Sequence, residues 1–133
     1  MPFVVDASVA AVWGLSDEAH PTADLAHQRL GSDPALVPAL WWYEVRNTFV
    51  VNERRGRVKP AETAAFLLIL SRLPIHPGGA PEEQRLLSLA RTHRLTIYDA
   101  AYLELAQREG IPLATLDAGL ARAAQAEGVP LLG

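Results

Sequence analysis

The feature that most constrains the fold of this chain is the alternation of short apolar runs with longer segments of helical periodicity. Such alternation is typical of βα units, in which helices join parallel strands and cover the sheet. The short runs predict strands at Phe3–Val5, Leu36–Val37, Leu73–Ile75, Leu113–Thr115 and Pro130–Leu132. We therefore predict an α/β fold, a three-layer α/β/α sandwich with a mainly parallel five-stranded sheet.

Proline and glycine residues mark the ends of the predicted helices. Pro60 stands where a first helical residue is expected, and Pro81 precedes two acids that suit a first turn. Gly56, Gly110 and Gly128 each follow a helical segment, at the position where a left-handed cap residue is common. The helices predicted in this way span residues 7–14, 21–30, 39–55, 61–72, 82–93, 99–109 and 118–127.

The size and composition of the chain are those of one globular domain. Its 133 residues predict a single domain over residues 1–133, and its hydrophobic fraction of 50% excludes a disordered chain. The chain has no cysteine, which excludes disulfides, zinc–thiolate sites and thiol nucleophiles. The longest apolar run, residues 64–70, is too short to cross a bilayer, and no basic segment precedes the first run as in a secretory signal. We expect a cytoplasmic protein without membrane contact.

Four carboxylates occupy positions that an α/β fold brings together. Asp6 and Asp117 each follow a predicted strand, and Asp99 opens a predicted helix. Glu44 lies further along another helix, where its longer side chain can reach inward. In an open parallel sheet, residues distant in sequence converge at the carboxyl ends of the strands. We therefore predict that these four acids form one cluster.

Clustered carboxylates require a counter-charge. Each of the four acids has apolar neighbours, as in Val5-Asp6-Ala7, and two like charges 4 Å apart repel by about 4 kcal/mol at an effective dielectric near 20. A divalent cation removes this repulsion, and Mg²⁺ and Mn²⁺ prefer carboxylate and water oxygens. The cluster thus predicts a Mg²⁺ or Mn²⁺ site at which activated water attacks a phosphate. Taken singly, Asp6 or Asp117 could equally cap a helix, so the prediction depends on all four acids.

Four segments of the chain resemble the motifs of PIN-domain nucleases, specifically the VapC-type toxins. They match in order, spacing and flanking residues along the whole chain, and they are Val5–Val9, Pro38–Asn47, Thr96–Tyr102 and Ala114–Asp117. The resemblance implies a Mg²⁺-dependent or Mn²⁺-dependent endoribonuclease that hydrolyses RNA phosphodiester bonds. Its catalytic, metal-binding acids are then Asp6, Glu44, Asp99 and Asp117. Ser8 and Thr115 match small hydroxyl positions that flank the family's pocket.

The same resemblance implies two protein partners, a cognate antitoxin and a second copy of the chain in a homodimer. A receiving surface for the antitoxin is predicted on the helices at residues 39–55 and 61–72, which carry more large apolar side chains than a small sheet buries. The net charge of −3 does not exclude RNA, because eleven acids remain against twelve bases once the four clustered acids are set aside. Arg46, two residues from Glu44, joins Ser8 and Thr115 as a candidate substrate-binding residue.

Three other functions compete with the nuclease. A metal-dependent phosphohydrolase of related α/β fold also gathers acids at strand ends, but the haloacid-dehalogenase type has Asp-x-Asp after its first strand, where this chain has Ser8. A receiver domain needs an acidic pair and a lysine, and the chain's single lysine is Lys59. A noncatalytic interaction module remains the other alternative, although such a module has no need of four convergent acids.

Overall fold

The computed structural model describes residues 1–15 and 17–133. Within these residues it contains four strands, β1 (Phe3–Val5), β2 (Ala35–Val37), β3 (Ile75–Pro77) and β4 (Leu113–Ala114). The helices of the same residues are α1 (Ala7–Gly14), α2 (Pro21–Arg29), α3 (Leu40–Arg54), α4 (Pro60–Leu70), α5 (Glu83–His93), α6 (Ile97–Glu109) and α7 (Ala118–Ala126). All strand pairs are parallel, in the order β3-β2-β1-β4. The predicted α/β fold with a parallel sheet is confirmed.

Strand β1 lies inside the sheet and is completely buried. Val4 pairs with Leu36 of β2 on one side and with Leu113 of β4 on the other. A parallel strand that is covered on both faces is expected to be apolar throughout, as Phe3–Val5 is. The carboxyl ends of β1 and β4 therefore lie next to each other, and the residues that follow them are neighbours in space.

The prediction of five strands was wrong by one. The segment Pro130–Leu132 forms only an isolated bridge, in which Leu131 pairs with Leu113. Leu113 donates its N–H to the carbonyl of Pro130, and Leu132 donates to the carbonyl of Leu113. The next hydrogen bond toward Ile111 would require an N–H on Pro130, which proline lacks. The ladder therefore stops at one pair, and the sheet has four strands over the described residues.

The predicted helices agree with the structure to within two residues at each end. The largest differences are at α4, which ends at Leu70, and at α6, which begins at Ile97 rather than Asp99. Gly110 ends α6 with a φ of 66°, as the sequence predicts. Arg94 ends α5 in the same left-handed conformation with a φ of 54°, and no glycine signalled this cap.

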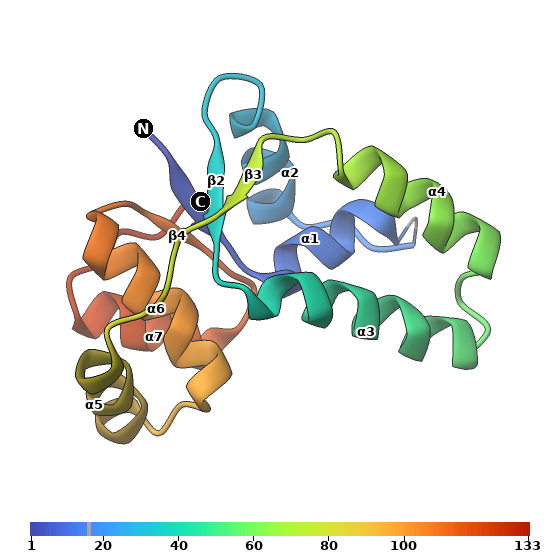
Figure 1. The fold of residues 1–133 in the computed structure, drawn as a ribbon. Helices are drawn as coiled ribbons and strands as arrows, with labels where there is room; N and C mark the ends of the chain where they lie inside the picture. Colours follow the sequence, from blue (N-terminus) through green and yellow to red (C-terminus); the bar gives the residue numbers. More distant parts are fainter. Residues whose placement is uncertain (16) are drawn as a thin grey trace.

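Two groups of helices flank the sheet (Figure 1), with α1–α4 on one side and α5–α7 on the other. Helix α6 contacts β1, β2 and β4, while α1 packs against both α2 and α3. Within the first group, the rings of Phe49 on α3 and Phe66 on α4 stack with their centroids 4.9 Å apart. Gly14 is required at the end of α1, because a Cβ there would lie 2.4 Å from the Phe49 ring.

Helix α4 is apolar on nearly all sides, yet only Leu70 is buried. Leu68 and Ile69 are 56% and 58% exposed, so the predicted excess of apolar surface is present on this helix. None of the helices in the described residues is both long and apolar enough to span a membrane.

Candidate active site

The structure brings the four predicted acids to one hollow of about 280 Å³, which we call the carboxylate pocket. Asp6 follows β1, Asp117 follows β4, Asp99 lies in the first turn of α6 and Glu44 lies on α3. Besides these acids, the pocket is lined by Ala7, Ser8, Asn47, Thr48 and Tyr102. The pocket is therefore built where the ends of the two neighbouring strands meet α3 and α6.

Asp6 is held rigidly at the base of the pocket. It is 5% exposed, and as the N-cap of α1 its Oδ1 accepts a hydrogen bond from the N–H of Val9 at 3.1 Å. The hydroxyl of Ser8 also donates to Oδ1, at 2.6 Å, and the hydroxyl of Thr115 donates to Oδ2. Burial raises the pKa of Asp6 and the nearby charge of Glu44 adds to the increase, while these three hydrogen bonds oppose it.

Ser8 and Thr115 join the two strand ends. The Ser8 hydroxyl accepts a hydrogen bond from the N–H of Leu116 at 3.0 Å, and the Thr115 hydroxyl accepts one from the N–H of Asp117 at 3.0 Å. Each hydroxyl thus connects the Asp6 carboxylate to the backbone after β4. Asp117 in turn is the N-cap of α7, where its Oδ1 accepts a hydrogen bond from Leu120 N at 2.9 Å. The capping role and membership of the pocket therefore coexist in both Asp6 and Asp117.

Glu44 reaches the pocket from α3 and meets a tyrosine there. The hydroxyl of Tyr102, on α6, donates a hydrogen bond to Glu44 Oε1 at 2.5 Å. Burial raises the pKa of Glu44 and the charge of Asp99 raises it further, whereas the Tyr102 hydrogen bond lowers it. Burial, together with the hydrogen bond to Glu44, also raises the pKa of Tyr102 far above its ordinary value. Tyr102 therefore keeps its proton and donates this hydrogen bond at neutral pH.

Asp99 interacts electrostatically with two other acids of the pocket, Glu44 and Asp117. Its N–H donates to the hydroxyl of Thr96, the N-cap of α6, at 3.0 Å. Burial raises the pKa of Asp99, and the charge of Asp117 adds to the increase. The charge of Glu44 raises the pKa of Asp6, that of Asp99 raises the pKa of Glu44 and that of Asp117 raises the pKa of Asp99, so three of the four acids disfavour ionisation of a neighbouring acid.

The donor set of the pocket fits a hard divalent cation. Four carboxylates, three hydroxyls and the amide of Asn47 supply oxygen ligands and hydrogen-bonding groups for its waters. A cation would also offset the mutual repulsion of the acids. Within residues 1–15 and 17–133, no group of three His, Asp or Glu side chains is already arranged to hold one ion. Joint coordination therefore requires the carboxylates to approach one another.

Arg46 does not line this pocket. Its guanidinium lies 3.6 Å from the centroid of the Trp42 ring, and its Nη1 donates to the carbonyl of Trp42 at 3.0 Å. It borders a separate small hollow with Leu70 and Ile75. Residues two apart on a helix point in nearly opposite directions, so the position of Glu44 in the pocket directs Arg46 away from it.

Three polar residues of the pocket were missed by the sequence analysis: Asn47, Thr48 and Tyr102. A signal for them exists in the spacing of the helices. Asn47 and Thr48 follow Glu44 by three and four positions, and Tyr102 follows Asp99 by three. Residues at these spacings share one face of a helix, so the sequence already indicates that each of the three lies beside an acid.

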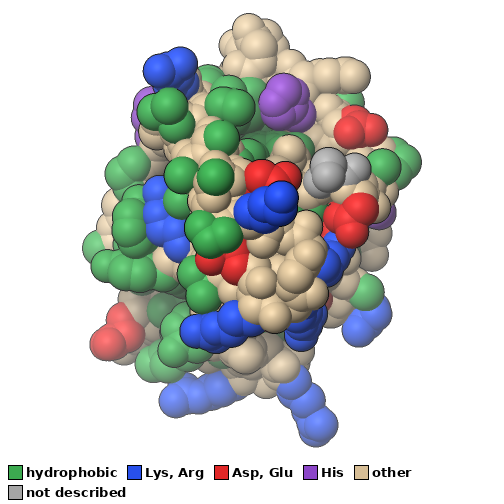
Figure 2. Space-filling view, turned by 90° about the vertical axis from the view of Figure 1, so that its right-hand side faces the viewer, with side chains coloured by type: hydrophobic (Ala, Val, Ile, Leu, Met, Phe, Trp, Pro, Cys, Tyr) green, Lys and Arg blue, Asp and Glu red, His purple; other side chains and the backbone are tan. Residues whose placement is uncertain are grey.

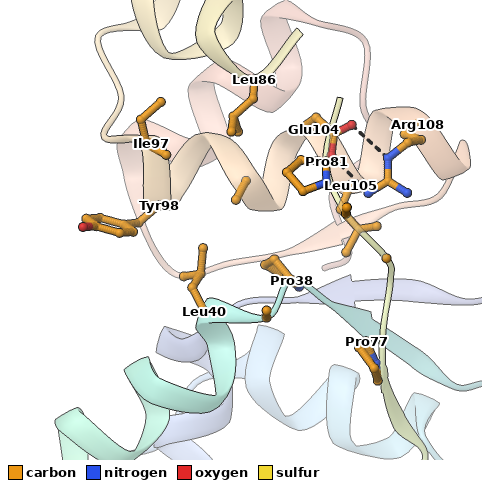
Figure 3. Close-up of a pocket in the computed structure, with 14 residues that line it drawn as sticks. Pro38, Leu40, Pro77, Pro81, Leu86, Ile97, Tyr98, Glu104, Leu105 and Arg108 are labelled. Carbon is orange, nitrogen blue, oxygen red and sulfur yellow. Dashed lines mark hydrogen bonds and ion pairs between the residues drawn. The ribbon is translucent and has the colours of Figure 1, made fainter. Parts of the chain in front are cut away.

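A second hollow, of about 590 Å³, lies between the start of α3, the segment after β3 and helices α5 and α6 (Figure 3). Its walls are mostly apolar and include Leu40 and Tyr98. At one end lies an ion pair between the buried Glu104 and the exposed Arg108, in which Arg108 Nε is 2.8 Å from Glu104 Oε2. None of the four acids of the carboxylate pocket lines this hollow.

Comparisons with known proteins agree with the geometry. The family model described as PIN domain matches residues 3–126. Ribonuclease VapC3 of Pyrobaculum aerophilum is 34% identical over 125 residues, which cover 91% of this chain and 93% of that protein.

Solved structures show the same fold. The crystal structure of PAE2754 from Pyrobaculum aerophilum has a TM-score of 0.72 at 24% identity, and the match covers 92% of this chain and 84% of the PAE2754 chain. VapC20 of Mycobacterium tuberculosis, described as a sarcin-ricin loop cleaving toxin, has a TM-score of 0.61 at 23% identity. That match covers 92% of this chain and 95% of the VapC20 chain. The structure of FitAcB from Neisseria gonorrhoeae has a TM-score of 0.58 at 18% identity, and the match covers 100% of this chain and 97% of the neighbour's chain.

The family match extends over nearly the whole chain, and the relative named Ribonuclease VapC3 is similar over the same length. The likeness to VapC-type proteins that the four motifs predicted is thereby confirmed. This chain belongs to the PIN-domain family.

Proposed function

We propose that this chain is a Mg²⁺-dependent or Mn²⁺-dependent endoribonuclease that hydrolyses RNA phosphodiester bonds, and that it acts as the toxin of a toxin–antitoxin pair. The observation that carries the proposal is the convergence of Asp6, Glu44, Asp99 and Asp117 in one pocket. The relative named Ribonuclease VapC3 supports the reaction, and the description of VapC20 as a toxin supports the biological role. A single nuclease domain over residues 1–133 and a cytoplasmic location remain parts of this proposal.

In the proposed mechanism the four acids would hold the cation. When bound, Mg²⁺ or Mn²⁺ would supply a more acidic water and would stabilise negative charge on the phosphate. Burial raises the pKa values of Asp6, Glu44 and Asp99, and a bound cation would oppose this increase because it favours the ionised carboxylates. The protein contributes the placement of the acids and an environment that concentrates negative charge.

We assign Ser8 and Thr115 the task of orienting Asp6. Both hydroxyls donate to its carboxylate, so neither proton is free for a phosphate in this arrangement. Substrate contacts are better supplied by Asn47, which is exposed at the edge of the pocket and has an amide that can donate to a phosphate oxygen. Arg46 is directed away from the pocket and is given no part in the cleavage step.

An antitoxin partner is proposed for the apolar face formed by α3 and α4. Leu68, Ile69 and Val50 are exposed there, and Arg54 and Arg55 lie exposed at the end of α3. Figure 2, which views this end of the molecule, shows hydrophobic side chains gathered on one half of the face and basic side chains along its lower edge. An apolar strip beside positive charge suits an amphipathic helix with an acidic flank. A homodimer is also proposed, to be tested by the mass of the purified chain in solution.

The direct test compares two aspartates in an RNA cleavage assay. With millimolar Mn²⁺, the natural chain should cut an RNA substrate, and addition of EDTA should stop the reaction. Asp6→Asn should abolish cleavage, because the amide keeps the shape of the side chain but loses the charge that holds the cation. Asp24→Asn, an exposed acid on α2, is the matched control and should cleave normally. Cleavage by the Asp6 variant at the natural rate would refute the proposal.

A further inference from the structure

The four acids of the carboxylate pocket are not equally restrained. The Asp6 carboxylate accepts three hydrogen bonds, and the Asp117 carboxylate is held as an N-cap. Glu44 has the longest side chain of the four and the most rotatable bonds, so it loses the most conformational freedom when it is held. In the described part of the chain, the hydroxyl of Tyr102 is the one hydrogen-bond donor recorded for the Glu44 carboxylate.

Tyr102 is placed to act as a fixed support. The residue is 1% exposed, and it lies on α6, the helix that packs against β1, β2 and β4. Its ring is therefore immobilised by the core, while its hydroxyl reaches the pocket. One helical turn earlier, the same face of α6 carries Asp99. Helix α6 thus supplies one acid directly and holds a second acid, 58 positions away, through Tyr102.

We infer that Tyr102 is a positioning residue for the cation, because its hydroxyl fixes Glu44 Oε1 and leaves the second carboxylate oxygen of Glu44 to bind the metal. This inference rests on the proposed function. Nothing in it requires Tyr102 to touch RNA or metal. A side chain that orients a metal ligand typically changes metal affinity or activity by about 10- to 100-fold when it is removed.

The test measures Mn²⁺ binding without RNA, by electron paramagnetic resonance of the free ion. Tyr102→Phe removes the hydroxyl and keeps the buried ring, so the dissociation constant for Mn²⁺ should rise by about 10- to 100-fold. Tyr43→Phe is the matched control, because it removes a hydroxyl next to Glu44 from a side chain that is 70% exposed. The control should bind Mn²⁺ as the natural chain does.

Three further measurements separate positioning from a general effect on structure. In a Glu44→Ala background, Tyr102→Phe should cause no additional loss of Mn²⁺ affinity, because no carboxylate remains to be oriented. In RNA cleavage, Tyr102→Phe should require more Mn²⁺ for half-maximal rate, while KM for RNA at saturating Mn²⁺ stays unchanged. Melting curves in EDTA should remain cooperative.

The possible results are distinct. Natural Mn²⁺ affinity in Tyr102→Phe, or an equal loss in the Glu44→Ala background, would overturn the inference, and so would a rise in KM for RNA without a change in Mn²⁺ affinity. Failure of the proposed function would appear elsewhere, as RNA cleavage by Asp6→Asn at the natural rate. If Asp6→Asn is inactive and Tyr102→Phe binds Mn²⁺ normally, the nuclease stands and only the role of Tyr102 is lost.

Discussion

The hydroxyl of Thr115 donates a hydrogen bond to the Asp6 carboxylate across 109 positions of sequence. The same hydroxyl oxygen accepts the N–H of Asp117. One small side chain thus connects two of the four acids, and it does so at the point where β1 and β4 end side by side. The geometry of the pocket depends on this connection as well as on the acids themselves.

Replacement of Thr115 by valine should weaken both stability and activity. Valine has nearly the same shape but leaves Asp6 Oδ2 and the N–H of Asp117 without their partner. Loss of a partner from a buried polar group costs about 1–3 kcal/mol, which urea unfolding would detect. The cleavage rate should fall by about 10- to 100-fold. Thr115→Ser retains the hydroxyl and should stay close to the natural chain in both measurements, and a natural rate in the valine variant would contradict the connection.

Divalent metal should stabilise the folded protein at neutral pH. Burial and the charge of a neighbouring acid raise the pKa values of Asp6, Glu44 and Asp99, and a cation that binds only the folded state removes this cost. At a Mn²⁺ concentration about 100 times the dissociation constant, the gain is about 2.7 kcal/mol. Melting in EDTA and in millimolar Mn²⁺ measures it. The difference should shrink in Asp6→Asn, and identical melting temperatures for the natural chain would argue against a metal site.

Glu127 should make a contribution to stability that depends on pH. Its carboxylate lies 2.6 Å from His93 Nε2 and 2.7 Å from Arg85 Nη2, and it also accepts a hydrogen bond from Gln107. The hydrogen bond with His93 is the main cause that lowers the pKa of Glu127 below its ordinary 4.5. Because the folded state favours the charged form, the stabilisation is complete above pH 4.5 and is lost as the pH falls through the lowered value.

The variant Glu127→Gln isolates this contribution. At neutral pH it should unfold about 1–2 kcal/mol more easily than the natural chain, since charge-assisted hydrogen bonds are replaced by neutral ones. Chemical denaturation at a series of pH values should show the two proteins converging below pH 4.5. A constant difference across the whole series would mean that the ionised form of Glu127 is not what stabilises the fold.

The apolar surface of α4 should be needed for capture of an antitoxin. When the chain is tagged and coexpressed with the reading frame upstream of its gene, a second protein should copurify. Leu68→Glu combined with Ile69→Glu should abolish copurification, because both side chains are more than half exposed and tolerate charge in the free chain. The matched pair Leu68→Met and Ile69→Met keeps the apolar character and should retain the partner. Recovery of the partner with the glutamate variant would place it on another surface.

The sequence predicted the elements of the fold because the signals for these elements are local. Helical periodicity, proline at first turns and glycine at helix ends act within a few residues, and the helices appear where these signals placed them. Strand β3 lies two residues later than predicted, because the N–H of Leu73 still bonds to the carbonyl of Leu70 at the end of α4. The fifth strand failed for a reason that was visible in the sequence, the missing N–H of Pro130.

The convergence of Asp6 and Asp117 could also be predicted, since both follow strands whose carboxyl ends lie at one edge of a parallel sheet. Helical spacing could likewise have excluded Arg46 from the carboxylate pocket. Its spacing of two residues from Glu44 directs it to the opposite side of α3, where it stacks on Trp42.

Only the tertiary structure decided which side chains from separate elements meet. The hydrogen bond from Tyr102 to Glu44 depends on how α6 and α3 approach each other, and that approach is set by the packing of each helix against the core. Packing energy is summed over many long-range contacts, so no local pattern around either residue encodes the distance between them. The sequence by itself determined the elements and the acids at their ends, and close packing between distant segments determined how those acids are held.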